Sequence, residues 1–182
     1  MSPGERQGPA LDRSAIQTAE PTALGELMRP LLVGAYGRWE WADGSAHAPD
    51  AWYRLLTEAV QPEARSLDDL VALAAFAYGP RVTAWTGEAQ AALAEPWAPA
   101  VFARCYATLS AAALASPEVA KGYFRDLRHA LRDEAGLSGR QVMFPLRAAL
   151  TGSMRGPCLG VVATLLGVVR CQQRIEAVWI CG

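Results

Sequence analysis

The sequence predicts an all-α fold made of two small packed helical subdomains. Apolar residues recur every three or four positions along most of the chain, which is the spacing of one face of a helix. Proline, glycine and hydroxyl residues separate these stretches where helices ordinarily begin or end. No segment alternates apolar and polar residues between turn signals, so we predict no sheet. With 182 residues, 52% of them hydrophobic, the chain has enough apolar material for a core.

The first subdomain is expected over residues 21–84, after a flexible tail over residues 1–20. The tail mixes glycine, proline and charged residues, and its few apolar side chains cannot offset the entropy lost on ordering. Ser66 is the N-cap expected for the third helix of this subdomain, with Asp69 three residues later. The expected elements are a helix from Pro21, a loop over 38–49, a helix over 49–61 and a helix over 67–78.

The second subdomain is expected over residues 85–182. Its clearest helix start is Ser116-Pro117-Glu118, which combines a capping hydroxyl, a proline in the first turn and an acid at the positive end of the helix dipole. Gly136 is expected to end that helix. The other helices are predicted over 87–95, 96–115, 138–151, 157–166 and 168–178.

Charge is distributed unevenly along the chain. The formal net charge is -1 with an isoelectric point near 6.1, which argues against broad, nonspecific binding to nucleic acid. Residues 121–174 nevertheless carry nine basic and three acidic residues, a net +6, so the remainder carries -7. All but one of the 17 basic residues are arginine, which suits base and phosphate recognition but is equally typical of a coding bias.

The residue pattern predicts no metal site and no membrane span. The four cysteines form no Cys-x-x-Cys pair, and both histidines lie far from them in sequence. Cysteines of this kind usually act as small core residues in a reducing compartment, so we expect a cytoplasmic protein. The longest apolar run, residues 158–169, is shorter than the roughly 20 residues that cross a bilayer.

No catalytic residue and no cofactor are predicted. The glycine-rich segment 152–156 lacks the lysine of a phosphate-binding loop and follows no predicted strand. The paired acids Asp68-Asp69 and Asp133-Glu134 are interpreted as a helix N-terminus and a solvated helix face, rather than as general acids or bases.

RNA recognition is the positive hypothesis. Proteins read single-stranded RNA loops by stacking splayed bases and by hydrogen bonding to their edges, which requires a few positioned groups. Pro145 falls inside a helical pattern, so we expect it to kink the chain and to present Leu146 and Arg147 at a bend. The turn over residues 152–157 follows soon afterwards.

The run from Ser138 to Leu159, continuing to Leu165-Leu166-Gly167, carries a family resemblance. It contains Pro-Leu-Arg-Ala-Ala-Leu-Thr-Gly over residues 145–152, then Gly156-Pro157. This order resembles the end of bacterial glutamyl-tRNA synthetases, and a weaker likeness covers roughly residues 25–178. The resemblance implies two all-helical subdomains that hold the anticodon loop of a tRNA, with tRNA-Glu favoured.

The resemblance also implies a set of RNA-binding residues. Arg147 would contact an anticodon base or its backbone, and Arg155, an addition in this chain, would approach a phosphate. The residues implied to line the pocket under the bases are Met154, Gly156, Pro157 and Leu159. The alternative for Arg147 is a structural role, in which it pairs with a helix C-terminus or with an acid such as Asp133.

Two departures from the family pattern affect the expected function. Discriminating members place an arginine after the proline that corresponds to Pro62, where this chain has Glu63, whose carboxylate would not do the same job. The His-x-Gly-His and Lys-Met-Ser-Lys-Ser signatures of the catalytic half are absent, and the sole lysine is Lys121. We therefore expect no amino-acid activation by this chain alone.

Three functional hypotheses follow. The first is a tRNA-binding module that resembles a free-standing anticodon-binding region. The second is a subunit of a split or paralogous glutamate-tRNA ligase, active only with a separate catalytic chain. The third is a protein-interaction scaffold that keeps the fold and has lost RNA binding, which the acidic first half and Glu63 favour and which Arg147 and the basic segment oppose.

Overall fold

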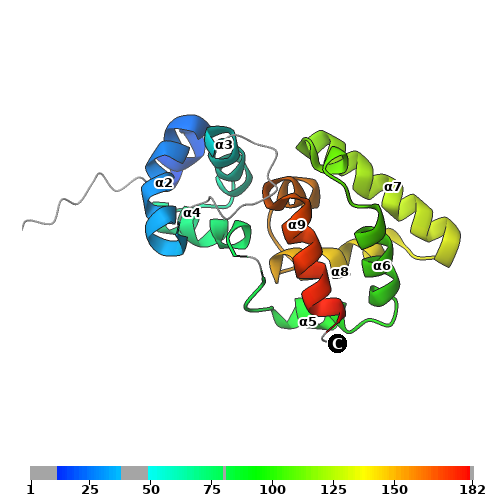
Figure 1. Ribbon diagram of the computed structural model, residues 1–182. Coiled ribbons are helices and arrows are strands. Elements are labelled where there is room, and N and C mark those ends of the chain that lie inside the picture. The colour runs from blue at the N-terminus through cyan, green and yellow to red at the C-terminus, as the bar shows by residue number, and fades with distance from the viewer. Residues whose placement is uncertain (1–11, 38–48, 80, 181–182) are drawn as a thin grey trace, which may run out of the picture.

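The computed structural model describes residues 12–37, 49–79 and 81–180 (Figure 1). Over these ranges it contains α-helices and short 3-10 helices and no strand, which confirms the all-α fold. The helices form two groups, α1–α4 and α5–α9, which Figure 1 shows side by side. The division of the chain after residue 84 stays a prediction, and it falls in the non-helical segment 81–86 that joins the groups.

The first group is built on the antiparallel packing of its two longest helices. Helix α2 (Pro21–Tyr36) lies against α3 (Pro49–Val60), and α4 (Leu67–Ala74) with the 3-10 helix η2 (Ala75–Ala77) completes the group. As predicted, the Ser66 side chain accepts a hydrogen bond from the Asp69 amide at the start of α4. Large, fully buried side chains of this core come from α2, α3 and α4: Leu24, Met28, Leu32, Trp52, Leu56 and Leu70.

Part of the segment expected to be a flexible tail is helical, so that expectation is wrong for residues 13–18. Asp12 caps α1 (Arg13–Thr18) by accepting a hydrogen bond from the Ala15 amide. Ile16, at 0% exposure, belongs to the core of the first group. Gln61 donates its side-chain amide to the Ile16 and Ala19 carbonyls over 2.7 and 2.9 Å. These contacts with distant residues provide the stabilisation that the local sequence lacks.

The second group surrounds a larger core. Helix α7 (Pro117–Ala135) begins at its Ser116 cap and ends at Gly136, which adopts the left-handed conformation, as predicted. Helix α8 (Gly139–Thr151) begins with a reciprocal pair of hydrogen bonds between Ser138 and Gln141. The remaining bounds are α5 Gly87–Leu93, α6 Ala98–Thr108 and α9 Leu159–Trp179.

The prediction of a single helix over residues 96–115 is wrong. Helix α6 ends at Thr108, and a separate 3-10 helix, η3, covers Ala112–Leu114. Leu109 adopts an extended conformation and is 7% exposed, so its side chain enters the core of the second group. Burial of this leucine and of Leu114 favours a turn that helical periodicity alone does not predict.

Of the two positions expected to disturb the last helices, Gly167 interrupts its helix and Pro145 does not. Gly167 has φ 71° and ψ 171°, so it breaks α9 between the two helices expected there. Pro145, in contrast, lies inside α8, which continues from Gly139 to Thr151. The expected presentation of Leu146 at a bend is wrong, because Leu146 is 0% exposed and lies in the core.

The two groups are joined by specific polar contacts. The Trp52 indole donates to the Leu165 carbonyl over 2.8 Å, and the Leu165 side chain lies in the core of the first group. The Thr86 amide donates to the Gly152 carbonyl over 2.9 Å. This bond holds the connecting segment 81–86 against the turn that follows α8.

Candidate nucleic-acid interface

The turn over residues 152–158 is held by its own side chains. Gly152 adopts a left-handed conformation with φ 73°. The Thr151 hydroxyl lies 2.8 Å from the Arg147 carbonyl and 2.9 Å from the Ser153 carbonyl, and it accepts the Ser153 amide over 3.2 Å. The Arg155 amide donates to the Ser153 hydroxyl over 3.1 Å. The turn therefore presents a defined surface between α8 and α9.

Arg147 is half-buried beneath this turn. Its Nη1 donates to the Gly156 carbonyl over a long 3.4 Å, the one hydrogen bond that its guanidinium makes to described residues. Burial lowers the pKa of Arg147, and the nearby Cys158 and Glu63 act in the opposite direction. Arg147 thus contacts the turn itself rather than Asp133, and the acid that influences it is Glu63. Most of its donor groups remain available to a ligand.

A cavity of about 260 Å³ lies at this turn, with walls from both helical groups. Its apolar lining comes from α3, α4, η2 and Pro157, and its polar lining includes Glu63 and Arg155, whose side chains are both exposed. The volume is below the range of about 300–1,000 Å³ typical of sites for drug-sized ligands. The lining residues are Ala59, Val60, Glu63, Ala72, Leu73, Ala75, Phe76, Thr151, Ser153, Arg155, Gly156 and Pro157.

The structure brings four of the six predicted site residues to this place. Arg155, Gly156 and Pro157 line the cavity, and Arg147 contacts Gly156 from below. Met154 packs instead towards a small cluster of buried alanines formed by α5 and α8. Leu159 is 3% exposed and lies in the core of the second group, so it supports the turn and presents no surface to a base.

The opposite wall of the cavity was not predicted from the sequence. Leu73 and Phe76 lie about 80 residues before the turn, and helical periodicity marks them only as apolar positions. Glu63 was noticed as a departure from a family pattern, but its position in the cavity lining is a result of the structure. A local pattern could not have found this wall, because it exists only once the two groups pack together.

Two members of the basic segment are buried, so its net +6 overstates the positive charge at the surface. Arg170 and Arg174 are 3% and 2% exposed. Arg170 donates to the Ala77 carbonyl over 3.2 Å. Burial lowers the pKa of Arg174 to about 10, so the guanidinium remains charged at neutral pH. These arginines have a structural function that counting charges does not reveal.

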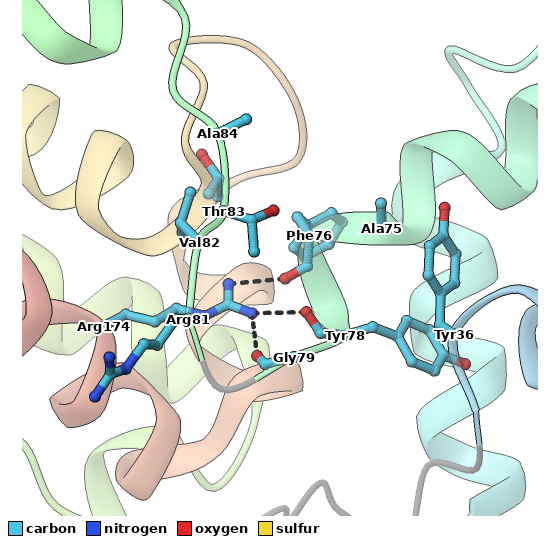
Figure 2. A pocket seen from close by; sticks show the side chains of 11 residues that line it. Tyr36, Ala75, Phe76, Tyr78, Gly79, Arg81, Val82, Thr83, Ala84 and Arg174 are labelled. Atoms are coloured by element: carbon cyan, nitrogen blue, oxygen red, sulfur yellow. Dashed lines mark hydrogen bonds between the residues drawn. The ribbon is translucent and has the colours of Figure 1, made fainter.

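Figure 2 shows how Arg174 connects the two groups. Its guanidinium donates to the carbonyls of Phe76, Tyr78 and Gly79 over 2.8, 3.1 and 2.7 Å, at the end of the first group. It also donates to the Leu150 carbonyl near the end of α8. A second cavity of about 430 Å³ lies beside it, and Ala75, Phe76 and Thr151 line both cavities. Arg174 therefore holds the wall that the two cavities share.

Other kinds of site find no support within the described ranges. Their histidine, cysteine and acidic side chains form no group of three or more that could hold a metal ion. The helices described include none that is both long and apolar enough to cross a bilayer. Cys105 and Cys171 are buried and Cys158 is exposed, while Cys181 lies outside the described residues, as do Trp39 and Trp41.

Comparison with known families decides the assignment. The sequence profile of the anticodon binding domain matches residues 23–179, which is most of the chain. The chain belongs to the anticodon binding domain family. The match includes helices of both groups but not α1, and it includes the turn after α8 and every residue that lines the cavity.

Curated relatives of this anticodon binding domain are glutamate-tRNA ligases. It is 31% identical over 191 residues to glutamate-tRNA ligase 2 of Alkalilimnicola ehrlichii, with 95% of this chain and 38% of the relative covered. It is 32% identical to the glutamate-tRNA ligase of Trichlorobacter lovleyi, with 91% of this chain and 33% of the relative covered. The domain thus spans between a third and two fifths of the length of these relatives.

Solved structures confirm the fold. A glutamate tRNA ligase from Elizabethkingia meningosepticum, crystallised in complex with its amino acid, superposes with a TM-score of 0.76 at 16% identity. The superposition covers 93% of this chain and 31% of that one. The glutamate-tRNA synthetase of Elizabethkingia anophelis gives a TM-score of 0.66 at 17% identity. At this identity the likeness supports the helical architecture alone.

Proposed function

We propose that this anticodon binding domain binds tRNA and seats one or more anticodon bases in the cavity at the turn after α8. The observation that carries the proposal is the composition of that cavity. Its apolar walls suit the faces of a base, and Arg155 and Glu63 provide a donor and an acceptor at its polar side. Arg147 adds a half-buried guanidinium with one long hydrogen bond to the turn.

The names of the relatives favour tRNA-Glu as the bound RNA, and a cytoplasmic site of action goes with this partner. With Glu63 at this position, the contacts to anticodon bases should differ from those that an arginine at the same position would make. A carboxylate accepts hydrogen bonds from amino groups, as in its pairing with the cytosine N4 amine, whereas an arginine donates to base acceptors. Selectivity among tRNAs is therefore expected to depend on Glu63.

The proposal is tested by measuring the affinity of the purified chain for a fluorescently labelled tRNA-Glu anticodon stem-loop. Arg147→Gln should weaken binding by about 1–3 kcal/mol if the guanidinium makes a bidentate base contact. Arg155→Gln should also weaken binding; an accompanying fall in salt dependence would show that Arg155 contacts a phosphate, and an unchanged salt dependence would show that it donates to a base. Arg54→Gln, which removes the same charge from the exposed face of α3, is the matched control and should have little effect.

The outcome distinguishes the proposal from a scaffold role. Saturable binding that Arg147→Gln weakens and Arg54→Gln does not would support an RNA site at the turn. Absence of wild-type binding at low salt would contradict the proposal and leave a protein-interaction role for the fold. Equal losses in Arg147→Gln and Arg54→Gln would indicate nonspecific attraction to the basic surface.

A second function is favoured by the names of the relatives. They are glutamate-tRNA ligases, and the domain spans 38% and 33% of the two described above. These names favour action as the tRNA-binding part of a glutamate-tRNA ligase, together with a catalytic half that the experiment supplies as a separate chain. Mixing the domain with a catalytic half that lacks this region should then stimulate glutamylation of tRNA. No stimulation at saturating domain concentration would contradict it.

A further inference from the structure

Helix α7 displays a row of four basic side chains that the cavity does not use. Lys121, Arg125, Arg128 and Arg132 are spaced by four, three and four residues, which places them on one narrow face of the helix. Three of the four are exposed and Arg128 is half-buried. We call this row the α7 stripe.

Three of the four acidic residues of α7 lie elsewhere on its surface, and the fourth, Glu118 in the first turn, borders the start of the stripe three residues before Lys121. Because an α-helix turns by about 100° per residue, Asp126 and Asp133 are roughly 120° around the helix from the centre of the stripe. Glu134 lies further round and pairs with Arg104 of α6 over 2.8 Å. Beyond its first turn, the surface of α7 thus has a basic flank and an acidic flank, although the whole chain carries almost no net charge.

The cationic groups of the stripe are available to an anion. Lys121 and Arg128 make no ion pair within the described part of the chain. Arg125 and Arg132 contact the adjacent Asp126 and Asp133 over 3.1 and 3.3 Å, but all four side chains are more than 60% exposed. Exposed pairs of this kind contribute little to stability, so a phosphate can replace either carboxylate at little cost.

The stripe begins close to the turn that borders the cavity. At Gly160, near the start of α9, an added Cβ would meet the Lys121 amide nitrogen at 3.0 Å, so α7 and α9 touch there. Pro157 lines the cavity and is only three residues before Gly160, a span of at most about 11 Å. Figure 1 shows α7 starting beside the first turns of α9 and running away from the first helical group.

Further along the stripe, the Arg128 side chain contacts the start of α8. The Arg128 side chain passes over Gly139, where an added Cβ would lie 3.7 Å from the Arg128 Cδ and Nη1 atoms. From Lys121 to Arg132 the stripe extends about 16 Å along the helix axis. Successive phosphates of one strand are about 3.4 Å apart along the axis of B-form DNA and closer in A-form RNA, so the stripe is long enough to contact several phosphates of one strand.

We propose that the α7 stripe binds the phosphate backbone of a double-stranded RNA stem whose loop bases occupy the cavity. This inference rests on the proposed function, since it assigns a second contact surface to the same RNA. Phosphate contacts position an RNA and supply salt-dependent affinity without reading its sequence. The stripe therefore raises the affinity for any stem continuous with the loop, and the cavity alone discriminates among bases.

The experiment compares two RNAs and two double variants. The RNAs are an anticodon stem-loop and a linear, unpaired oligonucleotide with the same loop sequence. The test variant is Lys121→Gln with Arg128→Gln. The control is Arg13→Gln with Arg54→Gln, which removes the same two charges from exposed positions on α1 and α3. Affinity is measured across a series of salt concentrations.

The test variant should bind the stem-loop on the order of tenfold more weakly at low salt, because two phosphate contacts are lost. The slope of log affinity against log salt should fall by about 1.4–1.8, at roughly 0.7–0.9 for each contact. Binding of the linear oligonucleotide and binding by the control should change less than about twofold. A second variant, Arg125→Gln with Arg132→Gln, should act in the same direction and guards against a local folding defect in the first.

Three results would overturn the inference. If both stripe variants bind the stem-loop with unchanged affinity and unchanged salt dependence, the stripe does not contact the RNA. The proposal for the cavity would remain intact. Equal losses for the stem-loop and the linear oligonucleotide would show that the stripe attracts RNA without recognising a stem. Failure of the wild-type chain to bind either RNA would contradict the proposed function and this inference together.

Discussion

Replacing Arg174 by methionine should destabilise the fold and loosen the junction between the two helical groups. The guanidinium donates to four carbonyls, those of Phe76, Tyr78, Gly79 and Leu150. Methionine fills a similar elongated volume and donates no hydrogen bond. The variant therefore removes the polar contacts while leaving most of the packing.

The expected magnitude depends on which carbonyls water can reach. The bonds to Leu150 and Tyr78 are buried, and those to Phe76 and Gly79 are partly buried beside the 430 Å³ cavity, where water can replace the donor. A buried carbonyl left without a partner costs about 1–3 kcal/mol, so the two buried ones cost about 2–6 kcal/mol. Relief of the buried charge offsets part of this, and we expect a net loss of about 3 kcal/mol.

The assay is urea unfolding followed by tryptophan fluorescence and by far-ultraviolet circular dichroism. Arg174→Lys is the informative comparison, because it keeps a buried charge but cannot reach four carbonyls with a planar fork. We expect both variants to be destabilised. If the helical groups then unfold independently, fluorescence and circular dichroism should report unfolding transitions at different urea concentrations. A loss below about 1 kcal/mol for Arg174→Met would refute the assignment of Arg174 as the connection between the groups.

Two further predictions concern the turn after α8. Gly152→Ala should destabilise the fold by at least about 2 kcal/mol, measured by thermal or urea unfolding, because the residue has φ 73° and a Cβ would lie 2.3 Å from the Ala84 carbonyl oxygen. Unchanged stability would contradict the described packing of segment 81–86 on the turn. Cys158 should react with a thiol reagent in the native protein while Cys105 does not, because burial raises the pKa of the Cys105 thiol to about 11. Mass spectrometry of the labelled peptides measures this directly, and rapid native labelling of Cys105 would be inconsistent with its burial.

The start and end of most helices were predictable because the signals are local. Ser66, Ser116 and Ser138 cap the helices that follow them, and Gly136 ends α7 in the conformation expected of a C-terminal glycine. Each of these features depends on hydrogen bonds between residues a few positions apart. The glycine between the last two predicted helices likewise interrupts α9 through its own backbone conformation.

The wrong expectations share a different cause. Residues 13–18 are helical because Ile16 reaches a core and Gln61 donates to the carbonyls of Ile16 and Ala19, and neither partner is near them in sequence. The helix over 96–115 is interrupted where burial of Leu109 favours a turn. In both cases contacts made over long sequence distances outweigh the local preference.

The candidate site was only half predictable. Arg155, Gly156 and Pro157 were identified from sequence and do line the cavity, whereas Leu159 lies in the core. The wall formed by Leu73 and Phe76 was not identified at all. A turn contributes one side of a cavity, and the other side depends on how the helical groups dock.

The sequence by itself determined the helical class, most helix boundaries and the segment that carries the turn, because each is encoded by periodicity and capping over a few residues. Only the tertiary structure decided which arginines are available to a ligand. Arg170 and Arg174 have the same chemistry as Arg125 and Arg128, yet they are buried because carbonyls at the end of the first group lie within their reach. The sequence gives the number of arginines, but the packing of the helices determines which guanidinium groups are bound by backbone carbonyls and which remain exposed at the surface.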